Sequence, residues 1–220
     1  MNIGHLLHRT PHPDSAGFTI DHGRGYDLFG AIFFGGRRDH VYKRLAELSG
    51  VRPGDRVLDV GCGTGYLTRR LAARAESGTV LGVEPSAAAL GRARALTKAP
   101  NCSYTVGIAE SLPCEDDSID VVANCLMLHH LPEDVRATAV GEMYRVLRPG
   151  GRLLIGEFRP PTTPIGIHVI GALTGPAMRD NPIELLGPMV ADAGFEEIHS
   201  GDLRPWIRYV TAVKPGAAAR

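Results

Sequence analysis

The sequence predicts an α/β protein in which a parallel β-sheet is covered by helices on both faces. Between residues 37 and 214, short apolar runs typical of buried strands alternate with segments of helical periodicity. One apolar run leads into a glycine-rich turn and then directly into a helix, an arrangement that favours a nucleotide-type binding site. The chain has 220 residues, of which 44% are hydrophobic, and this is enough for one sizeable core.

The first helix is expected over Arg37–Leu48, because Val41, Leu45 and Leu48 follow one another at helical spacing. Five parallel strands are expected, at residues 57–60, 79–83, 102–106, 119–123 and 152–156. Among the helices between them, one should begin at Tyr66, one should end at Leu96, and one should run from Pro132 to Leu147. The turn residues 148–151 are expected to end the last of these.

The end of the chain is expected to close the sheet. A helix over Glu184–Gly194 should direct Leu185, Met189 and Val190 inward. A final antiparallel strand pair is expected at residues 195–200 and 208–213.

The glycine-rich turn admits two interpretations. The dinucleotide fingerprint needs glycine or alanine at its sixth position, and counted from Gly61 that position is Tyr66, which is too large. The spacing Asp-x-Gly-x-Gly-x-Gly fits instead, at Asp59, Gly61, Gly63 and Gly65. In this motif the chain resembles the class I S-adenosylmethionine-dependent methyltransferases. A tight strand-to-helix turn without a ligand is the plainer alternative.

Two further segments narrow the resemblance. The Leu-Arg-Pro-Gly-Gly turn at 147–151 and the Leu-Pro-x-x-Asp-Asp-Ser-Ile-Asp segment at 112–120 are similar to the ubiquinone/menaquinone biosynthesis C-methyltransferase group. Shorter matches to that group are Tyr26-Asp27 and Arg37-Arg38. The resemblance covers residues 52–214 and implies a Rossmann-like seven-stranded sheet with the last strand antiparallel and helices on both faces.

The resemblance implies S-adenosylmethionine as the cofactor, and two carboxylates are placed to hold it. Asp59 is expected to accept a hydrogen bond from the cofactor's ammonium group, or to bond the N–H groups of its own turn. Glu84 ends the second strand and is expected to hold both ribose hydroxyls, as this position does in the family. A solvated carboxylate at a helix start is the alternative for Glu84.

Four other positions complete the expected cofactor site. Relatives usually have Asp-Ala after the third strand, whereas this chain has Ile108, expected to pack on adenine, and Ala109, whose N–H should reach a ring nitrogen. Asn124 should face the methionine end, and Arg37 or Arg38 should either neutralise the cofactor carboxylate or form a surface ion pair. The full set of expected contacts is Asp59, Gly61, Cys62, Gly63, Gly65, Glu84, Pro85, Ile108, Ala109, Glu110, Asn124, Tyr26 and Arg37.

Methyl transfer is an in-line displacement, so the protein mainly aligns donor and acceptor and excludes water. His129 and His130 follow the fourth strand, near the point where the methyl group should emerge, and one of them is the preferred base. A packing or hydrogen-bonding role is the alternative for each. His22, Tyr26 and His168 are weaker candidates. The sequence offers no convincing carboxylate cluster for a metal, so no metal ion is expected.

The acceptor is expected to be a small apolar or aromatic molecule. Residues 160–182 contain an apolar run, Ile165–Met178, which is too short to span a bilayer but is placed to cover the acceptor. A dimer contact and a membrane-surface segment are the alternatives for this insert. Carbon, oxygen and nitrogen all remain open as the methylated atom.

The expected organisation is an N-terminal arm or lid at residues 1–36, the methyltransferase domain at 37–214, and a flexible tail at 215–220. Most of the arm is expected to be loop. A homodimer is one expected assembly.

Charge and cysteine content argue against several other classes. Lys+Arg and Asp+Glu both number 24, so the formal net charge is zero and nucleic acid is not expected as a partner. The four cysteines are scattered and favour reduced thiols of a cytoplasmic protein over a zinc site or disulfide framework. No secretory-signal pattern and no membrane-length apolar stretch is present in the sequence, so membrane insertion is not expected.

The sequence therefore predicts a methyltransferase that acts on a small molecule. The alternative is an S-adenosylmethionine-binding protein that does not methylate, either as a regulatory module or through other sulfonium chemistry. A nicotinamide-dependent dehydrogenase is disfavoured by Tyr66.

Overall fold

The computed structural model describes residues 34, 36–163, 168 and 181–216, together with the backbone of β1 (Arg9–Pro11) and β2 (Phe18–Ile20). Strands β1 and β2 pair with each other in antiparallel fashion. Most of the other residues of the N-terminal arm lie outside the described part of the chain, so the expectation that most of the arm is loop stays a prediction. The two runs are only three residues long, which is too short for a periodic pattern to stand out in the sequence.

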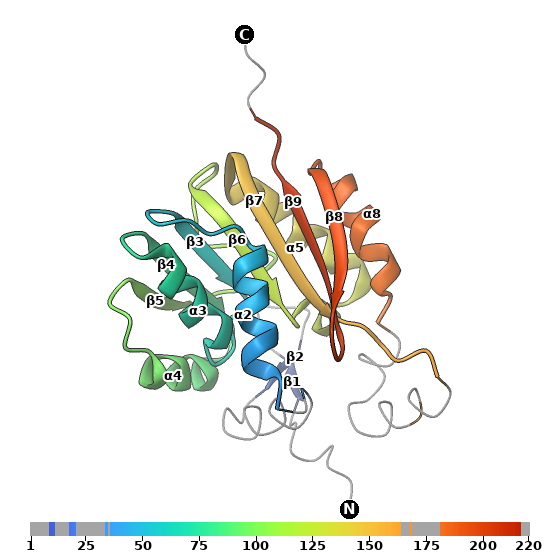
Figure 1. Cartoon of the computed structure of the whole chain (residues 1–220), viewed down its shortest axis with the longest axis horizontal. Coiled ribbons are helices and arrows are strands. Elements are labelled where there is room, and N and C mark those ends of the chain that lie inside the picture. The colour runs from blue at the N-terminus through green and yellow to red at the C-terminus, as the bar shows by residue number, and fades with distance from the viewer. Residues whose placement is uncertain are drawn as a thin grey trace, which may run out of the picture.

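Seven strands form the main sheet, in the spatial order β5-β4-β3-β6-β7-β9-β8 (Figure 1). Their bounds are β3 Arg56–Val60, β4 Thr79–Glu84, β5 Cys102–Val106, β6 Ile119–Cys125, β7 Leu147–Phe158, β8 Glu196–Leu203 and β9 Ile207–Val213. Strand β9 pairs antiparallel with both β7 and β8, whereas the pairs among β3 to β7 are parallel. The predicted seven-stranded sheet with an antiparallel last strand is confirmed.

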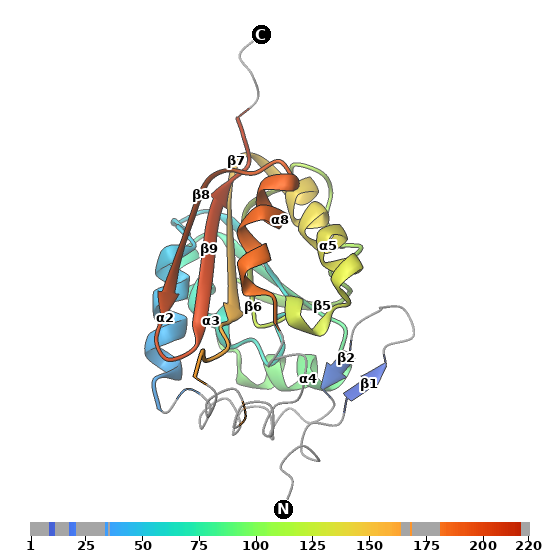
Figure 2. The same cartoon turned by 90° about the vertical axis from the view of Figure 1, so that its right-hand side faces the viewer.

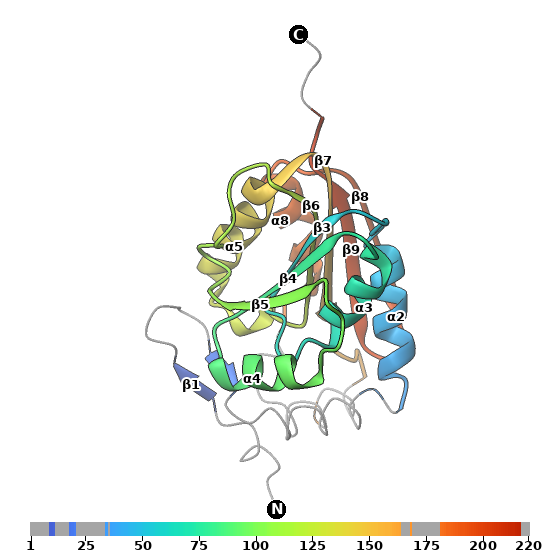
Figure 3. The same ribbon diagram turned by 90° about the vertical axis from the view of Figure 1, so that its left-hand side faces the viewer.

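Helices cover both faces of the sheet, as predicted. The α-helices are α2 Arg38–Leu48, α3 Tyr66–Ala75, α4 Ala87–Leu96, α5 Glu133–Val146 and α8 Leu186–Asp192. Figure 2 shows α2 and α3 on one side of the sheet and α5 and α8 on the other. Figure 3 shows β5 at the sheet edge, with α4 beside it. Within the described ranges, no helix combines the length and apolar character that crossing a membrane requires.

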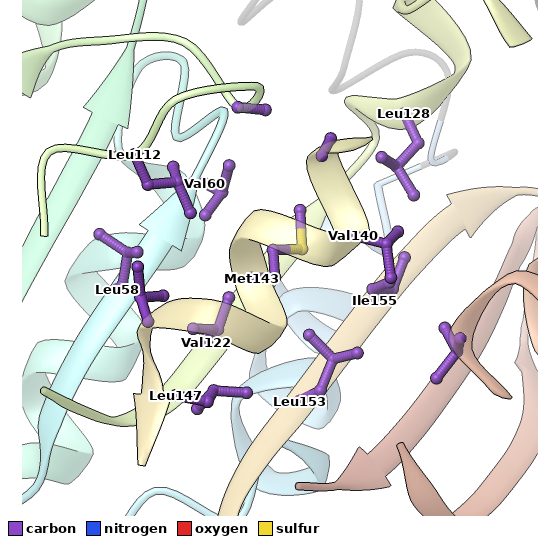
Figure 4. Close-up of a cluster of buried hydrophobic side chains, with 14 of the residues drawn as sticks. Leu58, Val60, Leu112, Val122, Leu128, Val140, Met143, Leu147, Leu153 and Ile155 are labelled. Atoms are coloured by element: carbon purple, nitrogen blue, oxygen red, sulfur yellow. The ribbon is translucent and has the colours of Figure 1, made fainter. Parts of the chain in front are cut away.

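The core lies in two layers, one on each face of the sheet. Along β3, Leu58 and Val60 join the cluster under α5 and α8, whereas Val57 joins the cluster under α2 and α3. Successive side chains of a strand point to opposite faces, so a strand covered on both faces reads as continuously apolar. Figure 4 shows part of the first cluster, where Met143 and Val140 of α5 lie among side chains of the strands.

Strand β7 starts earlier than predicted. Leu147 was expected to end a helix, but it is the first residue of β7, and residues 148–151 continue the strand instead of interrupting it. Gly150 has φ +75°, and its N–H donates to the carbonyl of Lys214 (2.8 Å), while Gly151 accepts from the Lys214 N–H (2.9 Å). The expected turn therefore finds partners in the sheet and becomes an irregularity within the strand.

The helix predicted over Glu184–Gly194 begins differently. Residues Ile183–Leu185 form a 3₁₀ turn, and only Leu186–Asp192 are α-helical. Since a 3₁₀ turn has about three residues per turn rather than 3.6, the inward face shifts by one position. Leu186 and Val190 are buried, but Leu185 is 46% exposed, so its predicted inward orientation is wrong.

The order of the strands creates a topological switch point at the carboxyl edge of the sheet. From β3 the chain moves outward through β4 to β5, and then returns to the other side of β3 at β6. Open α/β sheets bind ligands beside the carboxyl ends of strands at such a switch point. The glycine turn after β3 lies there, together with the ends of β4 and β6.

Candidate cofactor and acceptor site

The glycine turn connects β3 to α3 through left-handed backbone. Gly61, Gly63 and Gly65 have φ values of +68°, +53° and +71°. The N–H groups of Gly61 and Cys62 both donate to the carbonyl of Val83 in β4, at 2.8 and 3.0 Å. Such φ values are unfavourable for residues with a Cβ, which explains the motif's glycines locally.

The space around the glycines distinguishes their roles. A Cβ on Gly61 would collide with Met127, and a Cβ on Gly65 would collide with the Tyr104 hydroxyl. A Cβ on Gly63 would meet no atom within 4 Å among the described residues. The turn therefore packs tightly at its two ends and presents an open backbone surface at Gly63. This surface fits the close approach of a bound cofactor.

Glu84 fastens the turn to the end of β4. Its Oε2 accepts from the Gly63 N–H at 3.1 Å, and its Oε1 accepts from the Ser86 N–H at 3.0 Å. Ser86 in turn caps α4 by accepting from Ala89 N–H at 3.2 Å, and Pro85 lies between the two residues. Each carboxylate oxygen can accept more than one bond, so these contacts fix Glu84 without excluding a ribose diol.

Asp59 is buried beneath the turn, with only 1% of its surface exposed. The Thr68 hydroxyl donates to its Oδ2 at 2.6 Å. Burial raises the pKa of Asp59 to about 7, the negative charge of Glu84 adds to this rise, and the Thr68 bond opposes it. A cation beside Asp59 would favour its ionised form, which fits the ammonium group of the expected cofactor.

Asn124 lies within β6, not after it as predicted, and is fully buried. Its Nδ2 donates to the Val60 carbonyl at 2.8 Å, which orients the amide. Its Oδ1 has no hydrogen-bond partner within the part of the chain that the structure describes. A buried acceptor of this kind is unfavourable unless a donor reaches it, so Asn124 also fits a ligand with N–H or O–H groups.

Arg38, rather than Arg37, lines the pocket at the glycine turn, together with Asp59 and Gly63. The Arg38 guanidinium carbon lies 3.9 Å from the ring centre of Tyr66, and Arg70 stacks on the same ring at the same distance. Arg37 lines a different pocket. The sequence analysis left the two arginines open for the cofactor carboxylate but placed Arg37 in the set of expected contacts, whereas Arg38 is the one that lies at the glycine turn.

Residues 108–110, expected at the adenine, begin a loop that is fastened to α5. Ile108 bridges to Ser111, and Ala109 is buried. Beyond Glu110, the loop is held by Arg145, which donates to the carbonyls of Leu112 (3.1 Å) and Cys114 (2.9 Å). The loop therefore has a defined position beside the ends of β4 and β5.

A buried pair links the 3₁₀ turn Leu128–His130, which follows β6, to the end of β7. His129 Nδ1 and Glu157 Oε2 are 2.8 Å apart, and both side chains are 2% exposed. Glu157 Oε1 accepts from the N–H groups of Met127 (2.9 Å) and Leu128 (2.8 Å). Met127 is also the residue that a Cβ on Gly61 would strike, so the pair lies close to the glycine turn.

The two expected roles of His129, as a base and as a hydrogen-bonding residue, are compatible. The hydrogen bond to Glu157 also fixes the orientation of the imidazole. The His130 ring lies 4.0 Å from that of His129. Sequence reasoning missed Glu157, since the strand was predicted to end one residue earlier. The sequence does contain a signal for Glu157, because it is a single acidic residue directly after an apolar strand, at the edge of the sheet where ligands bind.

Some predicted site residues lie outside the described part of the chain. Tyr26 and His22 are among them, as is most of the insert at 160–182; His168 is described and exposed. Among the described residues, no group of three or more His, Cys, Asp or Glu side chains is arranged to hold a metal ion.

The sequence is similar to known methyltransferases. A family model described as a methyltransferase domain matches residues 57–151. The ubiquinone/menaquinone biosynthesis C-methyltransferase UbiE of Ectopseudomonas mendocina is 35% identical over 201 residues, which cover 79% of this chain and 77% of that protein. The enzyme of the same name from Azotobacter vinelandii is 40% identical over 62% of this chain, a match that spans only 55% of the relative's length.

Solved structures share the fold at lower identity. Phosphoethanolamine N-methyltransferase 2 of Haemonchus contortus, in complex with S-adenosyl-L-methionine, has a TM-score of 0.71 and 19% identity over 88% of this chain and 57% of that one. The [4+2]-cyclase SpnF has a TM-score of 0.65 and 21% identity over 89% of this chain and 95% of that one. At these identities the likeness concerns the fold alone.

Gly63→Ala should abolish cofactor binding while leaving the fold intact. The new methyl group enters open space, and the left-handed backbone costs about 1–2 kcal/mol of stability. Calorimetry with S-adenosylhomocysteine and a thermal melt measure the two effects. Gly65→Ala is the matched comparison, because its methyl group strikes Tyr104 and should lower the melting temperature further. Wild-type affinity in Gly63→Ala would contradict the close approach of a ligand at this residue.

Asp59→Asn should stabilise the cofactor-free protein at alkaline pH. Because the folded-state pKa is about 7 against an ordinary value of 3.8, the folded protein binds more protons than the unfolded chain between these values. The wild type therefore loses stability as pH rises through this window, and the variant does not. Urea unfolding at pH 5 and pH 8 should show a relative gain for the variant on the order of 2–3 kcal/mol. Parallel pH profiles of the two proteins would refute it.

Proposed function

Since the chain belongs to the family of S-adenosylmethionine-dependent methyltransferases, we propose that it methylates a small apolar or aromatic acceptor. Its cofactor is S-adenosylmethionine, which supplies a methyl carbon already activated by the attached sulfonium. The tasks of the protein are to bind this cofactor, to orient the acceptor and to remove a proton where the acceptor carries one.

Four residues are assigned to the cofactor. Glu84 accepts from the ribose hydroxyls, while Asp59 and the Asn124 Oδ1 accept from the ammonium group. Arg38 takes the carboxylate role, because it lines the glycine pocket with Asp59. Support for these assignments comes from the fixed Glu84 carboxylate, the raised pKa of Asp59 and the buried acceptor of Asn124.

The observation that carries the reaction assignment is the His129–Glu157 pair at 2.8 Å. When Nδ1 holds the hydrogen and donates it to Glu157, Nε2 carries a lone pair that can accept a proton. Glu157 does not need to move, because the N–H groups of Met127 and Leu128 hold its other oxygen. We assign His129 as the general base and Glu157 as the residue that positions it.

Two points support an apolar or aromatic acceptor. The sequence segment Ile165–Met178, which was expected to cover the acceptor, is rich in apolar residues. The similar proteins named above are C-methyltransferases of ubiquinone and menaquinone biosynthesis. A phenolic or quinol ring agrees with both points, because one base is enough to activate its ring carbon or its oxygen.

One observation favours the second candidate, cofactor binding without methyl transfer. A [4+2]-cyclase shares this fold, so the fold alone does not specify methyl transfer. The deciding test is incubation with methyl-labelled S-adenosylmethionine and a panel of phenols, quinols, naphthols and amines. Label should move to an aromatic acceptor, and mass spectrometry should locate it. Tight cofactor binding with no labelled product across the panel would support the second candidate.

His129→Gln and Glu157→Gln should both slow methyl transfer strongly. Loss of a general base lowers kcat by about 10²–10⁴-fold. In Glu157→Gln the new amide donates toward Nδ1, which places the hydrogen on Nε2 and removes the lone pair there. Affinity for S-adenosylmethionine should stay within about threefold in both variants, because neither residue is assigned to the cofactor.

His130→Gln is the matched control and should retain most activity. The measurement is kcat and KM for the acceptor, with cofactor affinity from calorimetry. A wild-type kcat in His129→Gln would contradict the assignment of His129 as the general base. It would leave the assignment of methyl transfer unaffected.

A further inference from the structure

A second pocket of about 310 Å³ lies at the carboxyl edge of the sheet, apart from the glycine turn. It is lined by Arg37, His40 and Val41 from the start of α2, and by Leu203 and Arg204 from the turn between β8 and β9. These two elements are far apart in sequence but meet at this edge of the sheet (Figure 1). The next residue along the chain, Arg38, lines the glycine pocket, so the two pockets are neighbours.

Both walls of the pocket are fixed by main-chain contacts. The Arg37 N–H donates to the Phe34 carbonyl at 2.9 Å, and its own carbonyl accepts from Val41 N–H at 3.0 Å. On the other wall, the Trp206 carbonyl accepts from the Arg159 N–H at 2.7 Å. The arginines at residues 37 and 204 therefore extend from ordered backbone.

Within the described part of the chain, carboxylates near the pocket do not compensate its positive charge. The carboxylate of Asp202 is engaged by both Arg159 and Arg208, each at 2.7 Å, and Asp39 is engaged by Arg70. Neither Arg37 nor Arg204 has a carboxylate partner among the residues that the structure describes. The lining of the pocket thus combines two arginines and one histidine with the apolar side chains of Val41 and Leu203.

We propose that this pocket binds a phosphate group, carried either by an anionic phospholipid or by a soluble phosphate ester. Two planar guanidinium forks match the several oxygens of a phosphate, and His40 adds a third donor. The inference is independent of methyl transfer, because it uses none of the residues assigned to the cofactor or the acceptor.

The test compares the cofactor-free full chain with two charge-matched double variants. Arg37→Gln/Arg204→Gln removes both guanidinium groups of the pocket. Arg74→Gln/Lys98→Gln removes two exposed charges near the ends of α3 and α4, and neither residue lines the pocket. Circular dichroism verifies that each protein is folded.

Two probes distinguish the sources of phosphate. Inorganic phosphate is titrated while the imidazole resonances are followed by NMR, and vesicles of phosphatidylcholine with or without phosphatidylglycerol are used for co-sedimentation. Each basic residue contributes about fivefold to binding at an anionic surface, so the pocket variant should bind anionic vesicles about thirtyfold more weakly. The control variant should bind like the wild type.

Loss with inorganic phosphate alone assigns a soluble phosphate ester, and loss with anionic vesicles alone assigns the lipid. Equal losses in the two double variants would show a general charge effect and overturn the proposal. The proposal also fails if the wild type binds neither probe.

Discussion

The site depends on one set of hydrogen bonds between neighbouring strand ends, in which the last residues of β4 accept hydrogen bonds from the N–H groups of the turn that follows β3. The Val83 carbonyl takes two of them and the Glu84 carboxylate takes a third, from Gly63. A turn of left-handed residues has no helix or sheet ladder to satisfy these groups, yet N–H groups removed from water must be paired. The hydrogen bonds to Val83 and Glu84 satisfy these N–H groups and, at the same time, place the open face of Gly63 beside the fixed carboxylate of Glu84.

Two buried carboxylates in the same site have opposite surroundings. Asp59 lies under the turn with one hydroxyl donor, and burial raises its pKa. Glu157 is as deeply buried, but three backbone N–H groups and His129 surround it. The first environment disfavours negative charge until a cation arrives, whereas the second surrounds the carboxylate with hydrogen-bond donors. A carboxylate that awaits a cation suits ligand binding, and one that is surrounded by donors suits the orientation of a neighbour.

Local chemistry made most of the fold predictable. The strand–turn–helix from Val57 onward and the alternation through residue 156 follow from apolar periodicity and glycine placement, and the seven-stranded sheet with an antiparallel last strand followed from the family resemblance. The errors in the predicted fold arose where contacts with other segments determine the local structure. Residues 148–151 look like a turn until Lys214 pairs with them, and Leu185 faces outward because its turn is 3₁₀. Glu157 was missed because the strand was predicted to end at residue 156, and only the tertiary structure distinguishes Arg38 from Arg37.

Tyr104 has a consequence for how this chain can change over evolutionary time. Its ring lies against two glycines from different elements, since a Cβ on Gly82 would approach Tyr104 Cδ1 to 2.7 Å and a Cβ on Gly65 would strike the hydroxyl. Residues 65, 82 and 104 are therefore not free to drift separately. A larger residue at Gly82 requires a smaller side chain at 104 and a shift of Cys62 Sγ, which the new Cβ would approach to 2.8 Å, so positions 82 and 104 should covary among descendants of this sequence.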